Sequence, residues 1–418
     1  MSNPSDDNDE GPIFSFIEEP LGIPADEGFG FFQGTPEDIL GPDDRFQLQA
    51  KLGFGINSSV WLAKDRQLGS HVALKILSGH ATLLNAESHL RELEIHRRLQ
   101  SLLPDETRHC NRLITHFSHQ GIEQDGEHLC LVLELEQTSL QDVWKAHSEA
   151  HHALPTVKRI MRHMLRGLVA LHRCGFAHTD LKPDNAMLSI TPSLSSNVID
   201  DWVLAHPPRV YPPSQSLYKI VTNAFVSERL PIPSIADLTL CDYKLADFSH
   251  AQQIDEQTTD HITPLTLRAP EVILGGPWDE EVDIWTFGCL VFTLLTRLPL
   301  FASEIRQNSL KHLRPGVDLT SECVQIFWQI TAFTSQRYHP LVLNVYPNSS
   351  QYFEPNGKLK SFKIFSLRPL ETCLRDAGCR ATEKDIDSAT ALMRRCLALN
   401  PSDRPSALLL LEDPWLNE

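Results

Sequence analysis

The chain has 418 residues, of which 41% are hydrophobic and 22% are charged. This is the composition of a globular protein, long enough for two or three domains or for one two-lobed enzyme with insertions. No apolar run follows a basic start, so we expect no secretory signal. The nine cysteines, an odd number without paired spacing, favour a reduced compartment, the cytoplasm, the nucleus or both.

The acidity of the chain is concentrated at the N-terminus. The net charge is −17, and residues 1–45 hold twelve acidic residues and one arginine, a net −11, which leaves −6 elsewhere. Residues 1–43 are therefore predicted to form an acidic, disordered tail that is dispensable for folding. The apolar cluster GFGFF (28–32) favours the alternative, in which the segment docks as an extra sheet edge. No feature indicates direct binding of nucleic acid.

Folding signals begin near Phe46, and the first part of the chain reads as strand-rich with one helix. Strands of alternating or apolar character are separated by a Gly-containing turn and a polar loop. The expected elements are strands within FQLQAKLGFGINSSVWLAKD (46–65) and HVALKIL (71–77), a helix over 86–100 and a strand over 129–135.

After Pro155 the pattern becomes helical, and Gly175 sits where a helix C-cap is expected. The most apolar stretch, residues 284–301, has internal threonines and an arginine, so it predicts a buried core helix and no membrane span. Residues 189–240, rich in Ser and Pro, and residues 302–365, of weak periodicity, look like insertions.

The stretch LGFGINSSV (52–60) places Gly53 and Gly55 between two predicted strands. Glycines without a Cβ let phosphate oxygens approach the backbone closely. Ser58 stands where the third glycine of the usual GxGxxG pattern falls, so a plain hairpin turn is the competing interpretation.

Lys75 lies in the apolar strand HVALKIL, where a lone lysine needs a reason. It is either a side chain that reaches solvent from a strand end or one held by a carboxylate of the following helix. Glu92 is the favoured partner and Glu94 the competitor. Such a lysine–glutamate pair grips ATP phosphates in protein kinases.

The loop GFAHTDLKPDN (175–185) gathers groups that handle charge. Phosphoryl transfer requires a group that orients a hydroxyl, a cation for the phosphate and ligands for Mg²⁺. Asp180 is suited to accept the hydroxyl proton and Lys182 to face the γ-phosphate. Asn185 offers a carbonyl oxygen to the metal, and Asp247, which closes the apolar run of YKLADFS, adds a carboxylate.

From about Phe46 to Leu416 the chain resembles a eukaryotic protein kinase, and most resembles the fungal branch of the SR-protein kinase (SRPK) family. The motifs that carry the resemblance are HTDLKPDN, LRAPEVILGGPWDEEVDIWTFGCLVF, SSQYFEPNGKLK and the arginine of NPSDRP. The resemblance implies an α+β, bilobal protein-kinase-like fold. A small β-rich N-lobe with one main helix (44–136) would precede a larger helical C-lobe (137–418).

Several residue roles follow from this resemblance alone. Glu271 would pair with Arg404, and Asp283 would anchor the backbone of the catalytic loop. The catalytic set would be Lys75, Glu92, Asp180 and Lys182, with Asn185 and Asp247 as metal ligands. The expected ATP-binding residues are Leu52, Gly53, Gly55, Val60, Ala73, Lys75, Glu134, Glu136 and Met187.

Four positions depart from the family pattern: Ser249 replaces the Gly of Asp-Phe-Gly, and His96, Thr179 and Pro264 also differ. We predict an active serine/threonine kinase that uses ATP and Mg²⁺, because every residue of the catalytic set is present. The alternative is a nucleotide-binding pseudokinase that acts as a protein-interaction module.

The expected partner is a protein substrate, which the resemblance extends to Arg/Ser-rich segments. The stretch expected to form an acidic docking groove, residues 318–333, carries only Asp318 and Glu322. The oligomeric state is left open by the sequence.

Overall fold

The computed structural model describes residues 17–122, 124–148, 153–189, 195–302, 321–360 and 367–418. The chain divides into two compact units. The first consists of residues 1–84, 115–132 and 199–229, and the second of residues 85–114, 133–198 and 230–418.

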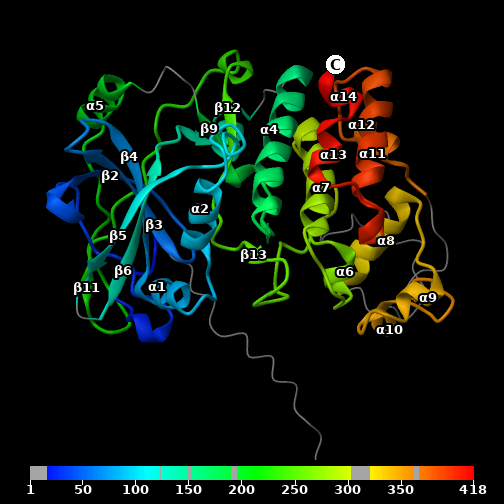
Figure 1. Ribbon diagram of the computed structural model, residues 1–418, viewed down its shortest axis with the longest axis horizontal. Coiled ribbons are helices and arrows are strands. Elements are labelled where there is room, and N and C mark those ends of the chain that lie inside the picture. The colour runs from blue at the N-terminus through cyan, green and yellow to red at the C-terminus, as the bar shows by residue number, and fades with distance from the viewer. Residues whose placement is uncertain (1–16, 123, 149–152, 190–194, 303–320, 361–366) are drawn as a thin grey trace, which may run out of the picture. The chain divides into compact units, whose positions relative to one another are not determined.

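The first unit is built on a six-stranded sheet with the strand order β1-β2-β3-β4-β6-β5 (Figure 1). Its strands are β1 (Ile39–Leu40), β2 (Phe46–Phe54), β3 (Ser58–Asp65), β4 (His71–Leu77), β5 (Leu113–Gln120) and β6 (Glu127–Glu134). The antiparallel β2–β3–β4 meander confirms the three strands predicted between residues 46 and 77. Buried and less buried residues alternate along β2, as expected for a strand with one face toward the core.

The helix predicted over 86–100 is shorter in the structure, where α2 spans Glu92–Gln100, and it is preceded by α1 (Gly79–Ala86), which was not predicted. Ser88 has φ 62°, in the left-handed region, and such a residue ends a helix. Glu92 is therefore the first residue of α2, and its side chain is buried.

The segment before β2 differs from the expected disordered tail wherever the structure describes it, from Ile17 onwards. Phe31 is only 1% exposed, and the ring of Phe32 meets that of Trp61 edge to face with centroids 6.2 Å apart. Strand β1 pairs antiparallel with β2. The aromatic pair supplies enough apolar burial to hold the segment despite its acidic composition, as the GFGFF alternative anticipates.

The insertion after the catalytic loop also contributes to the first unit. It contains α5 (Ser196–Ala205) and the hairpin β10 (Ser214–Gln215) and β11 (Val221–Thr222). Near its end, the N–H of Glu228 donates to the carbonyl of Lys51 at 2.8 Å, and the Phe225 ring lies 6.0 Å from that of Trp61. Residues 199–229 of the insertion are thus an ordered part of the sheet's surroundings.

The Lys51 side chain, on β2, is anchored by both of these segments. Its Nζ donates to Glu18 Oε2 at 2.8 Å and also to Glu19 Oε2. Glu18 in turn accepts hydrogen bonds from the backbone N–H and the hydroxyl of Ser227, at 2.9 and 2.8 Å. A buried charge requires such partners, so the N-terminal segment, the sheet and the insertion are joined at one point.

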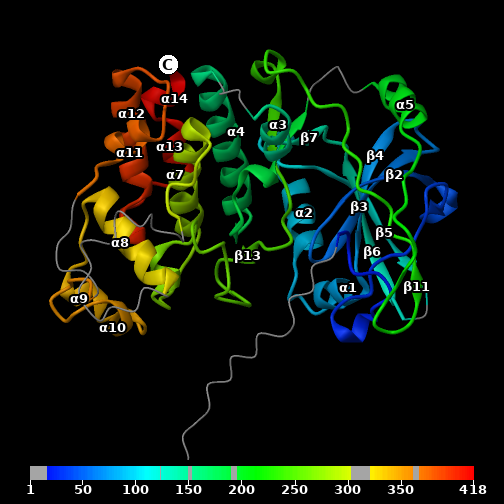
Figure 2. The same ribbon diagram turned by 180° about the vertical axis from the view of Figure 1, so that it is seen from behind.

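The second unit is mainly helical, and Figure 2 shows it from behind. Its helices are α2, α3 (Leu140–Ala146), α4 (Leu154–Arg173), α6 (Pro270–Ile273), α7 (Glu281–Thr296), α8 (Glu322–Thr334), α9 (Pro340–Leu343), α10 (Ser349–Tyr352), α11 (Leu370–Asp376), α12 (Glu383–Cys396), α13 (Ala407–Leu411) and α14 (Pro414–Asn417). Short strands form two small sheets, β12 (Asp242–Leu245) with β9 (Ala186–Ser189) and β7 (Thr138–Ser139), and β13 (Gln252–Gln253) with β8 (Phe176–Ala177).

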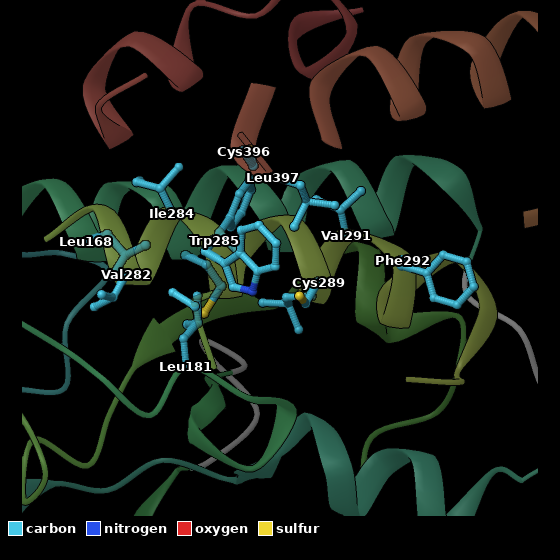
Figure 3. Close-up of a cluster of buried hydrophobic side chains, with 14 of the residues drawn as sticks. Leu168, Leu181, Val282, Ile284, Trp285, Cys289, Val291, Phe292, Cys396 and Leu397 are labelled. Atoms are coloured by element: carbon cyan, nitrogen blue, oxygen red, sulfur yellow. The ribbon is translucent and has the colours of Figure 1, made fainter. Parts of the chain in front are cut away.

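Helix α7 is the centre of the second unit's core. Its Trp285 is fully buried. The indole lies beside Leu397, at the end of α12, and beside other side chains of α7 (Figure 3). The prediction of a buried core helix from residue 284 is therefore confirmed, and Gly175 after α4 has φ 82°, as its C-cap role requires. Among the described residues, no helix combines the length and apolarity needed to cross a membrane.

Candidate active site

The catalytic loop, between β8 and β9 in the second unit, is held by one buried carboxylate on α7. Asp283 accepts the backbone N–H groups of His178 and Thr179 at 2.7 and 2.8 Å and contacts His172 Nε2 at 2.8 Å. Burial alone would raise the pKa of Asp283, but these bonds outweigh it and hold that pKa below its usual value. The expected anchoring role of Asp283 is confirmed.

The loop brings Asp180, Lys182 and Asn185 together, as their spacing predicts. Asp180 Oδ2 accepts hydrogen bonds from Lys182 Nζ at 2.7 Å and from Asn185 Nδ2 at 3.0 Å. Asn185 Nδ2 also donates to the carbonyl of Asp180 at 2.8 Å. Both amide hydrogens of Asn185 are thereby used, and its carbonyl oxygen remains as a ligand for a cation.

Asp247 follows β12 and has φ 62°, a left-handed conformation that costs energy for a residue other than glycine. Its Oδ1 accepts a hydrogen bond from Ser249 Oγ at 2.8 Å. One possible ligand atom from each of Asp180, Asp247 and His250 lies within 4.8 Å of the other two. Two carboxylates this close suit a hard cation such as Mg²⁺, which prefers oxygen ligands.

The departures from the family pattern make specific contacts in the second unit. Thr179, with φ 62°, donates its hydroxyl to the carbonyl of His250 at 2.7 Å, and Thr263 Oγ1 donates to the carbonyl of Thr179 at 2.6 Å. The first bond ties the segment after Asp247 to the catalytic loop, and the second ties the segment around Pro264 to it. His96 is buried and packs edge to face on Phe248 with ring centroids 5.2 Å apart.

Glu134 and Glu136, expected to offer backbone atoms to adenine, use their side chains otherwise. Lys244 Nζ on β12 lies 2.9 Å from Glu134 Oε2 and 2.8 Å from Glu136 Oε1. Burial raises the pKa of Glu136, an effect that Lys244 only partly opposes. This three-residue ion cluster fixes the chain that follows β6, and Met187 lies half-buried on the neighbouring strand β9.

The first unit carries the remaining predicted ATP-binding residues. In the β2–β3 ladder Gly53 pairs with Val60, and Val60 pairs with Lys75 across β3–β4. A Cβ placed on Gly53 or Gly55 would meet no atom within 4 Å, so internal packing does not require glycine at either position. Open space above a glycine turn is what a phosphate cradle needs. The pairing of Lys75 with Glu92 stays a prediction.

The helical framework contains a second buried anchor. Arg404 donates from both terminal nitrogens to the two oxygens of Glu271, at 2.6 and 2.7 Å. Its remaining hydrogen bonds go to the carbonyls of Ala398 and Glu281. The Glu271–Arg404 pair predicted from the motifs is confirmed.

Sequence reasoning missed the contacts of Ser249, His250 and Lys244. The sequence offers a signal for Ser249 and His250, because both follow directly after Asp247 in the motif. Lys244 had a weaker one, a lysine in an apolar strand pattern, because its partners lie more than 100 residues away. In the docking stretch, Glu322 begins α8, and Asp318 lies outside the described residues.

The anchored loop, the paired aspartates and the buried framework define a protein kinase. A protein kinase domain model matches residues 46–206 and 235–416, and the chain belongs to that family. The interruption between the two matched segments falls inside the predicted insertion 189–240.

Comparison with individual relatives narrows the class of protein kinase to which the chain belongs. The chain is 29% identical to the serine/threonine-protein kinase SRPK of Physarum polycephalum, over 98% of this chain and 93% of that protein. It is 24% identical to protein kinase dsk1 of Schizosaccharomyces pombe, over 90% and 81%, and 35% identical to SKY1 of Saccharomyces cerevisiae, over 38% and 21%. The chain is an SRPK-like serine/threonine protein kinase, and none of these relatives favours the pseudokinase alternative.

Proposed function

We propose that the chain transfers the γ-phosphate of ATP to a serine or threonine hydroxyl of a protein, with Asp180 orienting that hydroxyl and accepting its proton. The observation that carries this proposal is the loop geometry. Lys182 and Asn185 fix the Asp180 carboxylate at hydrogen-bond distance, and Asp283 pins the loop backbone. A positioned base of this kind contributes roughly 10²–10⁴-fold to a proton-transfer step.

Asn185 and Asp247 would hold Mg²⁺ in this proposal. Their oxygen donors fit it, because Asn185 commits its amide hydrogens to Asp180 and Asp247 is acidic and close to Asp180. Mg²⁺ supplies positive charge to the phosphate oxygens when bound. Ser249 directs one oxygen of Asp247 through its hydroxyl.

Lys75 and Glu92 would align the α- and β-phosphates, and Gly53 and Gly55 would let the phosphates approach the backbone. The adenine would lie among the remaining predicted ATP-binding residues, Leu52, Val60, Ala73, Glu134, Glu136 and Met187. Burial of Lys75 and Glu92 supports these roles, since buried charges are retained where a partner or ligand meets them.

The substrate would be a serine in an Arg/Ser-rich segment, a preference that rests on the resemblance to the SRPK family. The expected docking stretch, residues 318–333, carries only two acids, Asp318 and Glu322. Electrostatic recruitment by that stretch would therefore be weak.

The test compares Asp180→Asn with Asp201→Asn, a control at an exposed carboxylate outside the catalytic loop. With Mg-ATP, and an Arg/Ser-repeat peptide beside an uncharged serine peptide, Asp180→Asn should lower kcat at least about 100-fold, because the amide cannot accept the proton. The control should keep the parental rate, and both should melt like the parent. Parental turnover by Asp180→Asn would refute the proposed role.

A further inference from the structure

Three side chains that can bind a metal converge in the second unit: Asp180 of the catalytic loop, and Asp247 and His250 of the Asp-Phe-Ser-His segment. Their possible ligand atoms all lie within 4.8 Å of one another. A cation that bonds nitrogen and oxygen at about 2.0–2.2 Å holds its ligands roughly 3–4 Å apart. A contraction of at most about 2 Å would close these groups on an ion.

His250 adds to this cluster an imidazole nitrogen, a ligand type that Mg²⁺ does not prefer. Imidazole suits Zn²⁺ and its neighbours among the transition metals, whereas Mg²⁺ prefers oxygen ligands alone. Two carboxylates and one imidazole are three protein ligands, which leave a fourth position of a tetrahedral Zn²⁺ site for water. The His250 side chain is exposed, so a cation can reach it from solvent.

A chain of hydrogen bonds sets which ring nitrogen of His250 is free of its proton. Ser249 Oγ donates to Asp247 Oδ1 at 2.8 Å and lies 3.1 Å from His250 Nδ1. Because that hydroxyl gives its hydrogen to Asp247, it accepts from Nδ1–H, which leaves the lone pair on Nε2. Thr179 Oγ1 holds the backbone carbonyl of His250 at 2.7 Å. Ser249, which stands where the family has glycine, is thus a positioning residue for the imidazole.

We propose that Asp180, Asp247 and His250 form an inhibitory Zn²⁺ site in the nucleotide-free kinase. Lys182 Nζ already donates to Asp180 Oδ2, so the ion takes the other oxygen of Asp180. The inhibition rests on the proposed function, because the bound ion occupies the carboxylate that would accept the hydroxyl proton. The binding itself rests only on the three side chains.

The experiment titrates the nucleotide-free full chain with Zn²⁺ by calorimetry and with Co²⁺ by visible absorption. His250→Asn should weaken Zn²⁺ binding more than tenfold and remove the intense visible bands of a four-coordinate Co²⁺ site, because only two protein ligands remain. Ser249→Gly should weaken Zn²⁺ binding about 10- to 100-fold, since it removes the hydroxyl that orients both the ring and one oxygen of Asp247 but removes no ligand. His261→Asn, at another exposed histidine, should match the parent.

Equal Zn²⁺ affinity in the parent and in His250→Asn would overturn the proposal. If His250→Asn does not fold, as its melting curve would reveal, the parent decides alone, because absence of a saturable 1:1 Co²⁺ spectrum also overturns it. Failure of the proposed function is distinguishable, since it would appear as absent phosphotransfer by the parent with Mg-ATP in zinc-free buffer.

Discussion

Two of the buried ion clusters, one taken from each unit, show different ways of burying charge. In the second unit Arg404 and Glu271 form a one-to-one pair whose side chains are both fully buried. In the first unit a single lysine, Lys51, serves two carboxylates, Glu18 and Glu19. A planar guanidinium matches one carboxylate with two parallel bonds, whereas an ammonium is a point charge that several acids can share.

The difference appears in the balance of charge. Arg404 and Glu271 cancel, but the Lys51 cluster holds one excess negative charge. Burial, only partly opposed by Lys51, raises the pKa of Glu19. The Arg404–Glu271 pair belongs to the helical framework. The Lys51 cluster joins segments that lie outside the parts of the chain matched by the protein kinase domain model. Only the Arg404–Glu271 pair was predictable from motifs.

Deletion of residues 1–40 would break the comparison most strongly. It removes both acids of the Lys51 cluster, strand β1 and the buried rings of Phe31 and Phe32. Loss of two buried aromatic side chains costs roughly 3–6 kcal/mol before the charge is counted. We expect the truncated protein to melt many degrees below the parent in calorimetry. A protein beginning at Gly41 that melts like the parent would show that the segment contributes nothing to stability.

Arg404→Leu would break the balanced pair. It leaves Glu271 buried without its partner, which costs about 3–5 kcal/mol of unfolding free energy. The matched control is Arg394→Leu, which breaks the more exposed pair with Glu371 and should cost less than about 1 kcal/mol. Urea denaturation measures both, and equal midpoints for the two variants would contradict the claim.

Glu19→Gln has the smallest expected effect on stability, and it tests whether Glu19 carries the excess charge of the Lys51 cluster. A carboxyl whose folded-state pKa is raised stabilises the fold fully below its unfolded pKa, near 4.5, and loses that contribution as pH rises through the folded pKa. At neutral pH the substitution should therefore change stability by about 1 kcal/mol or less. It should also flatten the decline of the parent's melting temperature as the pH rises above about 4.5.

Glu18→Gln is the control for this pH series. Glu18 accepts two hydrogen bonds from Ser227 as well as one from Lys51, so its neutralisation should lower the melting temperature clearly. A parent and a Glu19→Gln variant with the same pH dependence would show that Glu19 does not carry the excess charge.

Much of the catalytic half could be predicted because its determinants are local. Asp180, Lys182 and Asn185 lie within six residues, so one loop brings them together whatever the rest of the fold does. Asp283 and Arg404 were placed by motif order. The start of α2 was not predictable, because the break at Ser88 is a backbone conformation that its residue type does not demand.

The surroundings of the first sheet could not be predicted for a different reason. Composition makes residues 1–43 look disordered, since charge dominates an average that hides two well-placed phenylalanines. The partners of Lys51 are distant in sequence, Glu18 33 residues before it and Phe225 174 residues after it. No local pattern records a pairing over such a separation.

The bond between Lys51 and Phe225 also bears on how the protein is made. A ribosome that adds about 5–20 residues per second needs roughly 9–35 s to travel from one to the other. During that interval the first sheet has emerged without the insertion that completes its ion cluster, while much of the second unit has not yet been synthesised. The Lys51 cluster of the first unit is therefore completed only after a segment far later in the chain has been synthesised.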